Sequence, residues 1–318
     1  MTRLFFKLRK ALALFISGII PLKNQRRAFR KKLIEAQFYS KKYAFEDSSK
    51  FPFYLSILAA AKNEGSYLEE WIEYHHMLGV ERFFLFDNES TDNTRAVLEP
   101  YIKSGLVVYN TFSFVGDFCP KPQQDLYTRA VKKYRNQTKW MAIIDIDEFI
   151  VPIKHNSIPD FLRGYEEFSQ IMLHYKFFGA AGHKTRPAGL VLENYLYARQ
   201  SDVNNVDTVV NSNTGKSILN PRAVVGRVFE HYSPVIGMPV DERKMPYLED
   251  PSTIGATTDI IEVNHYWEKS EEECAKRFLR NEDRVKNFYT NAQMVYNDDV
   301  LRFVPKLKER LSAKRENV

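Results

Sequence analysis

Three carboxylates interrupt an apolar run in the segment WMAIIDIDEFIVP, residues 140–152. Asp145, Asp147 and Glu148 follow a stretch with the composition of a buried strand. Adjacent buried carboxylates repel one another, and burying them unpaired is costly. A divalent cation removes both penalties, and oxygen ligands suit Mg²⁺ or Mn²⁺. On an extended segment Asp145 and Asp147 point the same way, so we expect them to hold a metal; the alternative is a strand end with solvated carboxylates.

Histidines offer further ligands for such a metal. His265 ends the strand-like run IIEVNH, and its neutral imidazole could complete the metal shell. The alternative is a hydrogen-bonded core histidine. His231, in FEHY, has the same two interpretations, whereas His75 and His76 lie within a predicted helix and are expected to be packing or surface residues.

Polar residues also follow two other predicted strands. Asn63 and Glu64 come after the apolar run 53–61, and Asp87 and Asn88 end a second apolar run. A carboxylate at a strand end can accept hydrogen bonds from ribose hydroxyls or from a base edge. The alternative is that this loop only caps the next helix.

Strands and helices alternate in the first half of the chain. The predicted strands are 53–61, 83–87, 106–112 and 140–145, and the predicted helices are 63–79, 90–105 and 125–135. Asn63 or Ser66 is expected to cap the first helix, and Ser90 or Thr91 the second. This order predicts an α/β fold, in which a parallel sheet carries helices on both faces and binds ligands beyond the carboxyl ends of its strands.

The second half is less regular. Short strand-like runs at 170–179, 190–198 and 217–230 indicate a mixed or antiparallel extension that forms an acceptor-side surface, followed by helices over 270–287 and 298–317. We divide the chain into a basic amphipathic segment (1–50), a main domain (51–290, with halves 51–152 and 153–290) and a basic C-terminal helix (291–318).

Composition excludes several classes of protein. Two distant cysteines, Cys119 and Cys274, form neither a disulfide framework nor a zinc site. The sequence has no G-x-G-x-x-G, no G-x-S-x-G and no recognisable nucleic-acid module, and Val210 replaces the first glycine of a phosphate loop before TGKS.

The net charge of +6 is concentrated near the N-terminus, where the apolar run 11–22 is too short to span a bilayer. It is expected to contact anionic lipid, or to pack on the domain.

Several segments together resemble glycosyltransferase family 92 and the family 2-like group, also described as the domain of unknown function 23 type. They are LSILAAAKNEGSYLEEWIEYHHMLGVERFFLFDNESTDNT, WMAIIDIDEFIVP, FFGAAGHKTRPAGLVLENY, GKSILNP and NHYWEKSEEE, in order from about Leu55 to Arg280. The resemblance implies a GT-A fold with a Rossmann-like, mostly parallel sheet, a nucleotide-sugar donor that is UDP-linked, and Mn²⁺ or Mg²⁺. In this chain NES replaces the usual NGS, which places Glu89 near the presumed donor.

The resemblance also implies residue roles. Asp145 and Asp147 match the D-x-D that holds the metal and the donor diphosphate, and His265 matches a late histidine near them. The residues that match the nucleotide-binding and phosphate-binding positions are Asn63, Glu64, Asp87, Asn88, Lys216 and Lys269.

The expected reaction transfers a sugar to a glycan or lipid-linked acceptor, and the resemblance implies inversion. A carboxylate must then reach the acceptor hydroxyl, and our preference is the pair Glu249 and Asp250 over Glu148 and Glu230. The alternatives are a nucleotidyltransferase on a similar sheet and a catalytically silent membrane-associated scaffold. We expect a cytoplasmic protein, peripheral on the inner face of the membrane, or a Golgi protein if the source is eukaryotic.

Overall fold

The computed structural model describes residues 40–113, 122–199, 215–246, 257–278 and 294–316. The strands are β1 (Phe53–Ala61), β2 (Arg82–Asp87), β3 (Val107–Thr111), β4 (Thr138–Ile143), β5 (Glu148–Pro152), β6 (Gln170–Phe177), β7 (Tyr197–Arg199), β8 (Gly215–Leu219), β9 (Pro239–Asp241), β10 (Ile261–His265) and β11 (Met294–Tyr296). The helices are α3 (Gly65–Met77), α4 (Thr94–Lys103), α5 (Pro122–Tyr134), α6 (Ile158–Leu162), α7 (Val191–Asn194), α8 (Glu271–Phe278) and α10 (Val304–Glu316), with short 3₁₀ turns at Ser48–Lys50, Arg163–Tyr165 and Leu301–Phe303.

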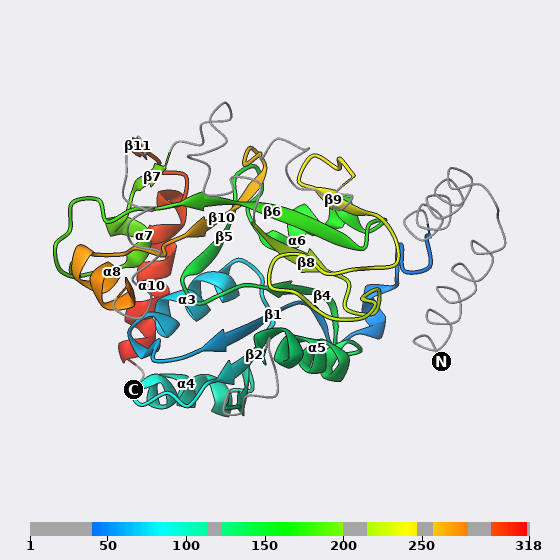
Figure 1. Ribbon diagram of the computed structural model, residues 1–318, viewed down its shortest axis with the longest axis horizontal. Helices are drawn as coiled ribbons and strands as arrows, with labels where there is room; N and C mark the ends of the chain where they lie inside the picture. Colours follow the sequence, from blue (N-terminus) through cyan, green and yellow to red (C-terminus); the bar gives the residue numbers. More distant parts are fainter. Residues whose placement is uncertain (1–39, 114–121, 200–214, 247–256, 279–293, 317–318) are drawn as a thin grey trace, which may run out of the picture.

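The first half forms the predicted parallel sheet, in the order β3-β2-β1-β4 (Figure 1). Successive residues of β1 face opposite sides: Ile57 and Ala59 pack in a core with α3 and α4, and Leu58 packs in a second core with α5. Helices therefore cover both faces, as expected. Gly79 and Gly105, with φ of +99° and +77°, follow α3 and α4 and confirm the predicted helix ends.

The second half extends the same sheet in mixed orientation. Beyond β4 the order is β8-β6-β10-β5; β8 runs antiparallel to β4 and β6, β10 runs parallel to β6, and β5 runs antiparallel to β10. Strand β9 also pairs with β6, and β7 pairs with β11 in a separate two-stranded sheet. The predicted α/β fold, with a mostly parallel sheet and a mixed extension, is confirmed.

The sheet must curl, because a short connection joins two distant strands. Strand β5 lies four strands away from β4 in the sheet. The pairing registers place Ile143, the last residue of β4, level with Met172 of β6. They place Glu148, the first residue of β5, level with Phe177, which lies further along β6. In a flat sheet these offsets are about 19 Å sideways and about 17 Å lengthwise, or about 25 Å along the diagonal. Five residues span at most about 18 Å. Curling brings the start of β5 back towards the end of β4.

Side chains of α3 satisfy the free backbone edge of β5, the last strand of the sheet. Trp71 Nε1 donates to the carbonyl of Glu148 (2.8 Å), and the Tyr74 hydroxyl donates to the carbonyl of Ile150 (3.1 Å). The amide of Ile150 donates to His75 Nε2 (3.2 Å). A helix thus replaces the neighbouring strand that this edge would otherwise need, and it fixes the position of Glu148.

The predicted caps of the first two helices are wrong. Neither Asn63 nor Ser66 caps α3; the amide of Gly65 donates instead to Asp92 Oδ2 (3.0 Å), from the loop after β2. Asn63 is not available because its Oδ1 accepts from the amide of Thr91 (2.7 Å). The start of α3 and the loop before α4 therefore hold each other.

The second helix begins later than predicted. Asn93, rather than Ser90 or Thr91, precedes α4, and its side chain makes no capping hydrogen bond. Ser90 is engaged by Asp87, whose Oδ1 accepts from both the amide (3.0 Å) and the hydroxyl (2.6 Å) of Ser90. The polar residues after β2 therefore organise the loop itself before the helix starts.

Other boundaries also differ from the predictions. The run 190–198 contains the helix α7 as well as β7, because the carboxylate of Glu70 accepts from the amides of Val191 (2.9 Å) and Leu192 (3.0 Å). The run 217–230 is a strand only to Leu219, and the C-terminal segment contains β11 in addition to a helix. Helix α10 lies beside α3 (Figure 1), where Arg310 pairs with Glu73 (2.9 Å).

Candidate active site

A pocket of about 500 Å³ opens where several strands end. Glu64 reaches it from the loop after β1, Asp145 from the end of β4, Phe177 from the end of β6 and His265 from the end of β10. It is also lined by Ala60, Gln123, Ile146, Asp147, Glu148, Tyr175, His231, Trp267 and Arg277. The site thus lies beyond the carboxyl ends of β1 and β4, as predicted from the alternation of strands and helices.

The acidic segment between β4 and β5 is a tight turn and not the expected extended segment. The amide of Glu148 donates to the carbonyl of Asp145 (3.1 Å), and the amide of Asp145 donates back to Glu148 Oε2 (2.9 Å). Because the chain turns here, the two aspartates have different partners. Asp145 Oδ2 accepts from Lys216 Nζ (2.7 Å), and Asp147 Oδ2 accepts from Arg277 Nη1 (2.8 Å).

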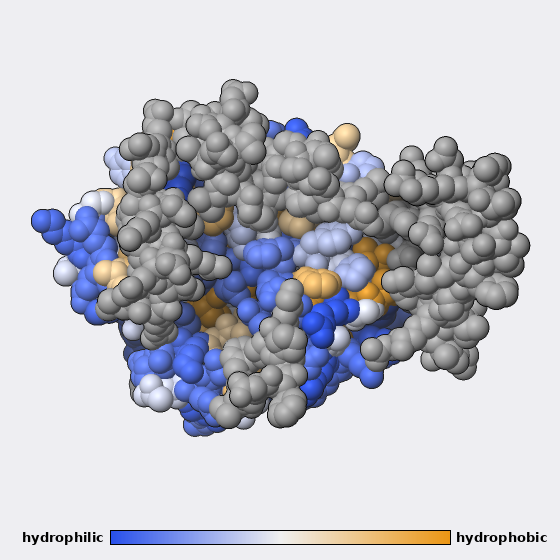
Figure 2. Space-filling model, viewed as in Figure 1, coloured by the Kyte–Doolittle hydropathy of each residue, from blue (hydrophilic) through white to orange (hydrophobic). Residues whose placement is uncertain are grey.

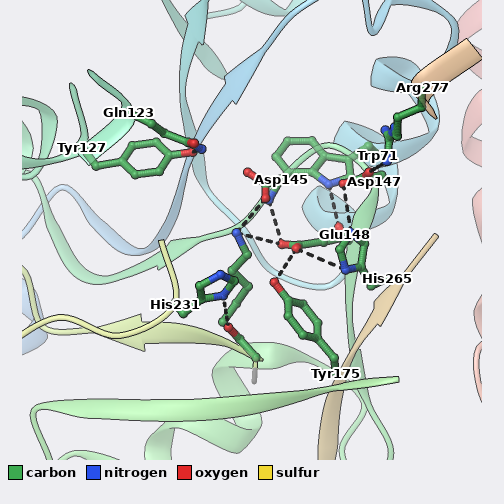
Figure 3. Close-up of polar contacts among 12 residues, drawn as sticks. Trp71, Gln123, Tyr127, Asp145, Asp147, Glu148, Tyr175, His231, His265 and Arg277 are labelled. Carbon is green, nitrogen blue, oxygen red and sulfur yellow. Dashed lines mark hydrogen bonds and ion pairs between the residues drawn. The ribbon is translucent and has the colours of Figure 1, made fainter. Parts of the chain in front are cut away.

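Glu148 lies at the centre of the polar contacts (Figure 3). Its side chain is fully buried, and its Oε1 accepts from the Tyr175 hydroxyl (2.7 Å). Its Oε2 lies 3.5 Å from Lys216 Nζ, and its Oε1 lies 3.8 Å from His265 Nδ1. Burial raises the pKa of Glu148, although the Lys216 ammonium opposes that rise.

Asp147, Glu148 and His265 form a group that could hold a metal ion. One ligand atom from each lies within 4.8 Å of the others. Direct pairing brings His265 opposite Glu148 in neighbouring strands, and His265 Nε2 lies 3.7 Å from Asp147 Oδ1. His265 Nδ1 is buried and has no hydrogen-bond partner within the described part of the chain, so in the deprotonated ring it is available as a metal ligand. Asp145 lines the same pocket but lies outside this group.

The electrostatics of the group favour the charged carboxylate of Asp147 and the protonated form of the His265 imidazole. Burial opposes ionisation of Asp147, but His265 and Arg277 outweigh it and hold the pKa of Asp147 well below its usual range. Burial likewise opposes protonation of His265, and Asp147 and Glu148 outweigh it and raise the pKa of His265. A metal ion at this site would take the place of the imidazole proton, because a ring nitrogen must be deprotonated to bind a metal.

The four residues predicted for the nucleotide lie together at the ends of β1 and β2, but only Glu64 lines the pocket. Burial raises the pKa of Glu64 to about 7. Asp87 Oδ2 accepts from the Tyr109 hydroxyl (2.6 Å), and the amide of Asn88 donates to the carbonyl of Ala61 (2.8 Å). These contacts order the loop and leave the predicted nucleotide-binding roles as predictions.

The backbone of Glu89 has a conformation that is usually found in glycine. Its φ is +52°, in the left-handed region that side chains other than glycine disfavour. This is the position at which the chain has NES in place of NGS. The substitution therefore keeps the backbone shape of the loop while adding a carboxylate, which is exposed.

The two lysines predicted to bind phosphate are both buried. Lys216 is 1% exposed and pairs with Asp145 and Glu148, which raise its pKa against the effect of burial. Lys269 is 5% exposed; its Nζ lies 3.5 Å from the centre of the Tyr67 ring and 3.9 Å from Glu64 Oε2. Lys216 thus neutralises part of the negative charge of the acidic turn, and its predicted role in binding phosphate stays a prediction.

Some predictions lie outside the described residues, and some residues of the site were not predicted. Glu249 and Asp250, the expected catalytic pair, fall outside the described ranges. Tyr175, Trp267 and Arg277 were not singled out from the sequence, although all three line the pocket. Tyr175 lies in a continuous buried run of β6, which is the ordinary pattern of a strand covered on both faces, and Arg277 is one of many basic residues.

Solved glycosyltransferase structures resemble part of the chain. S. aureus TarS in complex with UDP-GlcNAc aligns with a TM-score of 0.33 and 14% identity, over 54% of this chain and 46% of TarS. M. tuberculosis glucosyl-3-phosphoglycerate synthase, with Mn²⁺, UDP-glucose and phosphoglyceric acid, aligns with a TM-score of 0.28 and 15% identity, over 54% of this chain and 58% of that one.

Curated relatives match shorter segments. A glycosyltransferase family 92 protein of Ricinus communis is 27% identical over 177 residues, which are 52% of this chain and 30% of the relative. The galactan β-1,4-galactosyltransferase GALS2 of Arabidopsis thaliana is 30% identical over 123 residues, 33% of this chain and 21% of GALS2. This chain thus spans less than a third of either relative. The sequence profile of glycosyltransferase family 92 matches residues 56–301, most of the chain. The chain belongs to glycosyltransferase family 92.

Proposed function

We propose that this protein is a glycosyltransferase that moves a sugar from a nucleotide-sugar donor to a glycan acceptor. The observation that carries the proposal is the meeting of Asp147, Glu148 and His265 in one pocket, beyond the strand ends of an α/β sheet. Membership of family 92 supports the same reaction class. UDP as the donor nucleotide, and inversion at the anomeric carbon, are part of the proposal.

The residues present fit a divalent metal ion. Two carboxylates and an imidazole with a free ring nitrogen would hold it, and Mn²⁺ or Mg²⁺ accepts such ligands. When bound, the ion would neutralise charge on the leaving nucleoside diphosphate.

The chain's own residues prepare this site. Tyr175 and Lys216 hold the carboxylate of Glu148 from one side, and Trp71 holds its backbone from the other. These contacts fix Glu148 before any substrate binds, which lowers the reorganisation that the reaction requires. Because these contacts already engage the carboxylate of Glu148, it suits the role of a fixed metal ligand better than that of the base that takes the proton of the acceptor.

The acceptor needs a carboxylate that can take its proton. Glu230 is occupied by Gln124, whose Nε2 donates to it (3.2 Å), and it does not line the pocket. We therefore keep Glu249 and Asp250 as the proposed catalytic pair, and Glu249→Gln with Asp250→Asn should abolish transfer while leaving donor binding intact. Unchanged transfer in both single variants and in the double variant would refute this assignment.

The experiment that tests the function measures release of nucleoside diphosphate. Purified protein is incubated with a panel of nucleotide sugars, Mn²⁺ and oligosaccharide acceptors, and the products are analysed by mass spectrometry. We expect transfer with one donor, and we expect Asp147→Asn to lower the rate by about 100-fold or more, the effect of losing a group that stabilises developing charge. Full activity of Asp147→Asn, or pyrophosphate release from a sugar phosphate and a nucleoside triphosphate, would contradict the proposal.

We also propose that the N-terminal segment 1–50 places the enzyme at the inner face of a membrane. The support is its basic sequence with interleaved aromatic residues. Most of this segment, residues 1–39, lies outside the described residues. Within the described ranges, every helix is too short or too polar to span a membrane. Sedimentation with vesicles of phosphatidylcholine, with and without anionic phosphatidylglycerol, tests the contact; equal binding to both would refute it.

A further inference from the structure

The guanidinium of Arg277 lies in the pocket and pairs with a proposed metal ligand. Arg277 is in the last turn of α8, and its Nη1 donates to Asp147 Oδ2 (2.8 Å) and to the carbonyl of Trp267 (2.9 Å). Its side chain is 32% exposed, whereas that of Asp147 is 10% exposed. A partly exposed arginine is therefore paired with a nearly buried carboxylate (Figure 3).

This pairing conflicts with metal binding at the same carboxylate. A cation held by Asp147, Glu148 and His265 would place two positive charges beside the guanidinium. Like charges at such a distance repel strongly in a partly buried site. Arg277 and the metal therefore compete for Asp147, and the exposed side of the guanidinium leaves it room to move away.

The pocket offers the displaced guanidinium a new partner when a donor is present. A planar guanidinium binds phosphate oxygens in a bidentate way. Among the described lysines and arginines, Arg277 is the one that lines the pocket. Lys216 is already shared by Asp145 and Glu148, and Lys269 is buried against Tyr67.

We propose that Arg277 is an exchangeable counter-ion of the donor site. Its guanidinium neutralises Asp147 before the donor binds, gives up that carboxylate to the metal, and then binds the diphosphate of the donor. The proposal rests on the proposed function, because it takes the ligand to be a metal-bound nucleotide. It assigns Arg277 two opposite effects: the residue weakens binding of the metal alone and strengthens binding of the nucleotide.

The opposite signs make the proposal testable without measuring turnover. Mn²⁺ binding is measured by the electron paramagnetic resonance signal of the free ion, and binding of UDP, with GDP in parallel, by calorimetry at saturating Mn²⁺. We expect Arg277→Met to bind Mn²⁺ alone about two- to fivefold more tightly, the worth of one partly exposed ion pair. We expect it to bind the preferred nucleotide about ten- to 100-fold more weakly, the worth of a charge-assisted contact.

Two further variants separate the possible causes. Arg277→Lys keeps the charge but not the planar fork, so its affinity for Mn²⁺ should stay near wild type while nucleotide binding weakens; it also serves if Arg277→Met does not fold. Lys276→Met, on the same helix, removes an exposed lysine that pairs with Glu272 (2.5 Å), and it should change neither affinity.

The outcomes distinguish this proposal from the proposed function. Wild-type protein that binds both ligands, with an Arg277→Met variant that binds Mn²⁺ no more tightly, would show that the guanidinium is a fixed structural partner and would overturn the exchange. Unchanged nucleotide affinity in Arg277→Met would overturn the second half of the proposal. Wild-type protein that binds neither Mn²⁺ nor either nucleotide would overturn the proposed function itself.

Discussion

His75 should make the stability of this protein sensitive to acid in a predictable way. The imidazole is completely buried, with Nδ1 2.8 Å from the carbonyl of Trp71 and Nε2 accepting from the amide of Ile150. The neutral ring satisfies both contacts, because Nδ1 donates to the carbonyl and Nε2 accepts from the amide. In the protonated ring Nε2 also carries a hydrogen, so it can no longer accept from the amide of Ile150. Burial accordingly lowers the pKa of His75 from 6.5 to about 3.

The sign and size of the effect follow from this shift. Because the folded-state pKa lies below the unfolded value, the contribution of His75 to stability is complete above pH 6.5 and is lost as the pH falls from 6.5 towards 3. Each pH unit in this window lowers the free energy of unfolding by up to about 1.4 kcal/mol. Between pH 7.5 and pH 5 the loss is about 2 kcal/mol.

The variant His75→Gln isolates this effect. Glutamine can donate to one backbone group and accept from the other, but it does not titrate. Urea unfolding at pH 7.5 and pH 5 should show that the wild type loses about 2 kcal/mol more than His75→Gln does over this interval. His76→Gln, at the exposed neighbour on the same helix, is the matched control.

Comparison with the variant is needed because other groups act in the opposite direction. Burial raises the pKa of Glu70 and of Glu262 to about 7, so each favours the folded state more as the pH falls from 7 towards 4.5. These contributions are common to the wild type and to His75→Gln, and they cancel. If the difference in unfolding free energy between the two proteins is the same at both pH values, the argument about His75 is refuted.

Two further predictions concern the acidic turn and the loop after β2. Lys216→Met should lower the free energy of unfolding by about 3–5 kcal/mol, because it leaves the buried carboxylate of Glu148 without the lysine ammonium that pairs with it. Chemical denaturation measures this loss, and a loss below about 1 kcal/mol would mean that the lysine is dispensable for stability. Glu89→Gly should raise stability by about 0.5–1 kcal/mol, since glycine adopts φ of +52° without strain; a lower thermal midpoint in the variant would contradict this.

The parallel half of the sheet could be predicted because its signals are local. Each strand from β1 to β4 is a short apolar run with a helix of clear periodicity beside it, and Gly79 and Gly105 end two of those helices. The strand-end rule then placed Asn63, Glu64, Asp87, Asn88 and the group 145–148 at one edge. Of these, Glu64 and the group 145–148 line the pocket, whereas the other three organise the loops beside it.

The remaining features depend on contacts between distant parts of the chain. Nothing local separates β4 from β5 in WMAIIDIDEFIVP; the division becomes necessary only when Glu148 pairs with His265, more than 100 residues later. Helix α7 depends on Glu70, which lies 121 residues before Val191. The partners of Asp145 and Asp147 likewise come from β8 and α8. Local periodicity contains no information about such pairings.

The short connection between β4 and β5 couples the shape of the protein to its acidic residues. The residues that bridge these strands, 144–147, include both aspartates, and their limited reach requires the sheet to bend. A longer bridge would release that bend, widen the hollow above the strand ends and separate the aspartates from the histidine opposite. Insertions are therefore tolerated less well at this bridge than in the surface loops, since the same four residues set the curvature of the hollow and supply the negative charge within it.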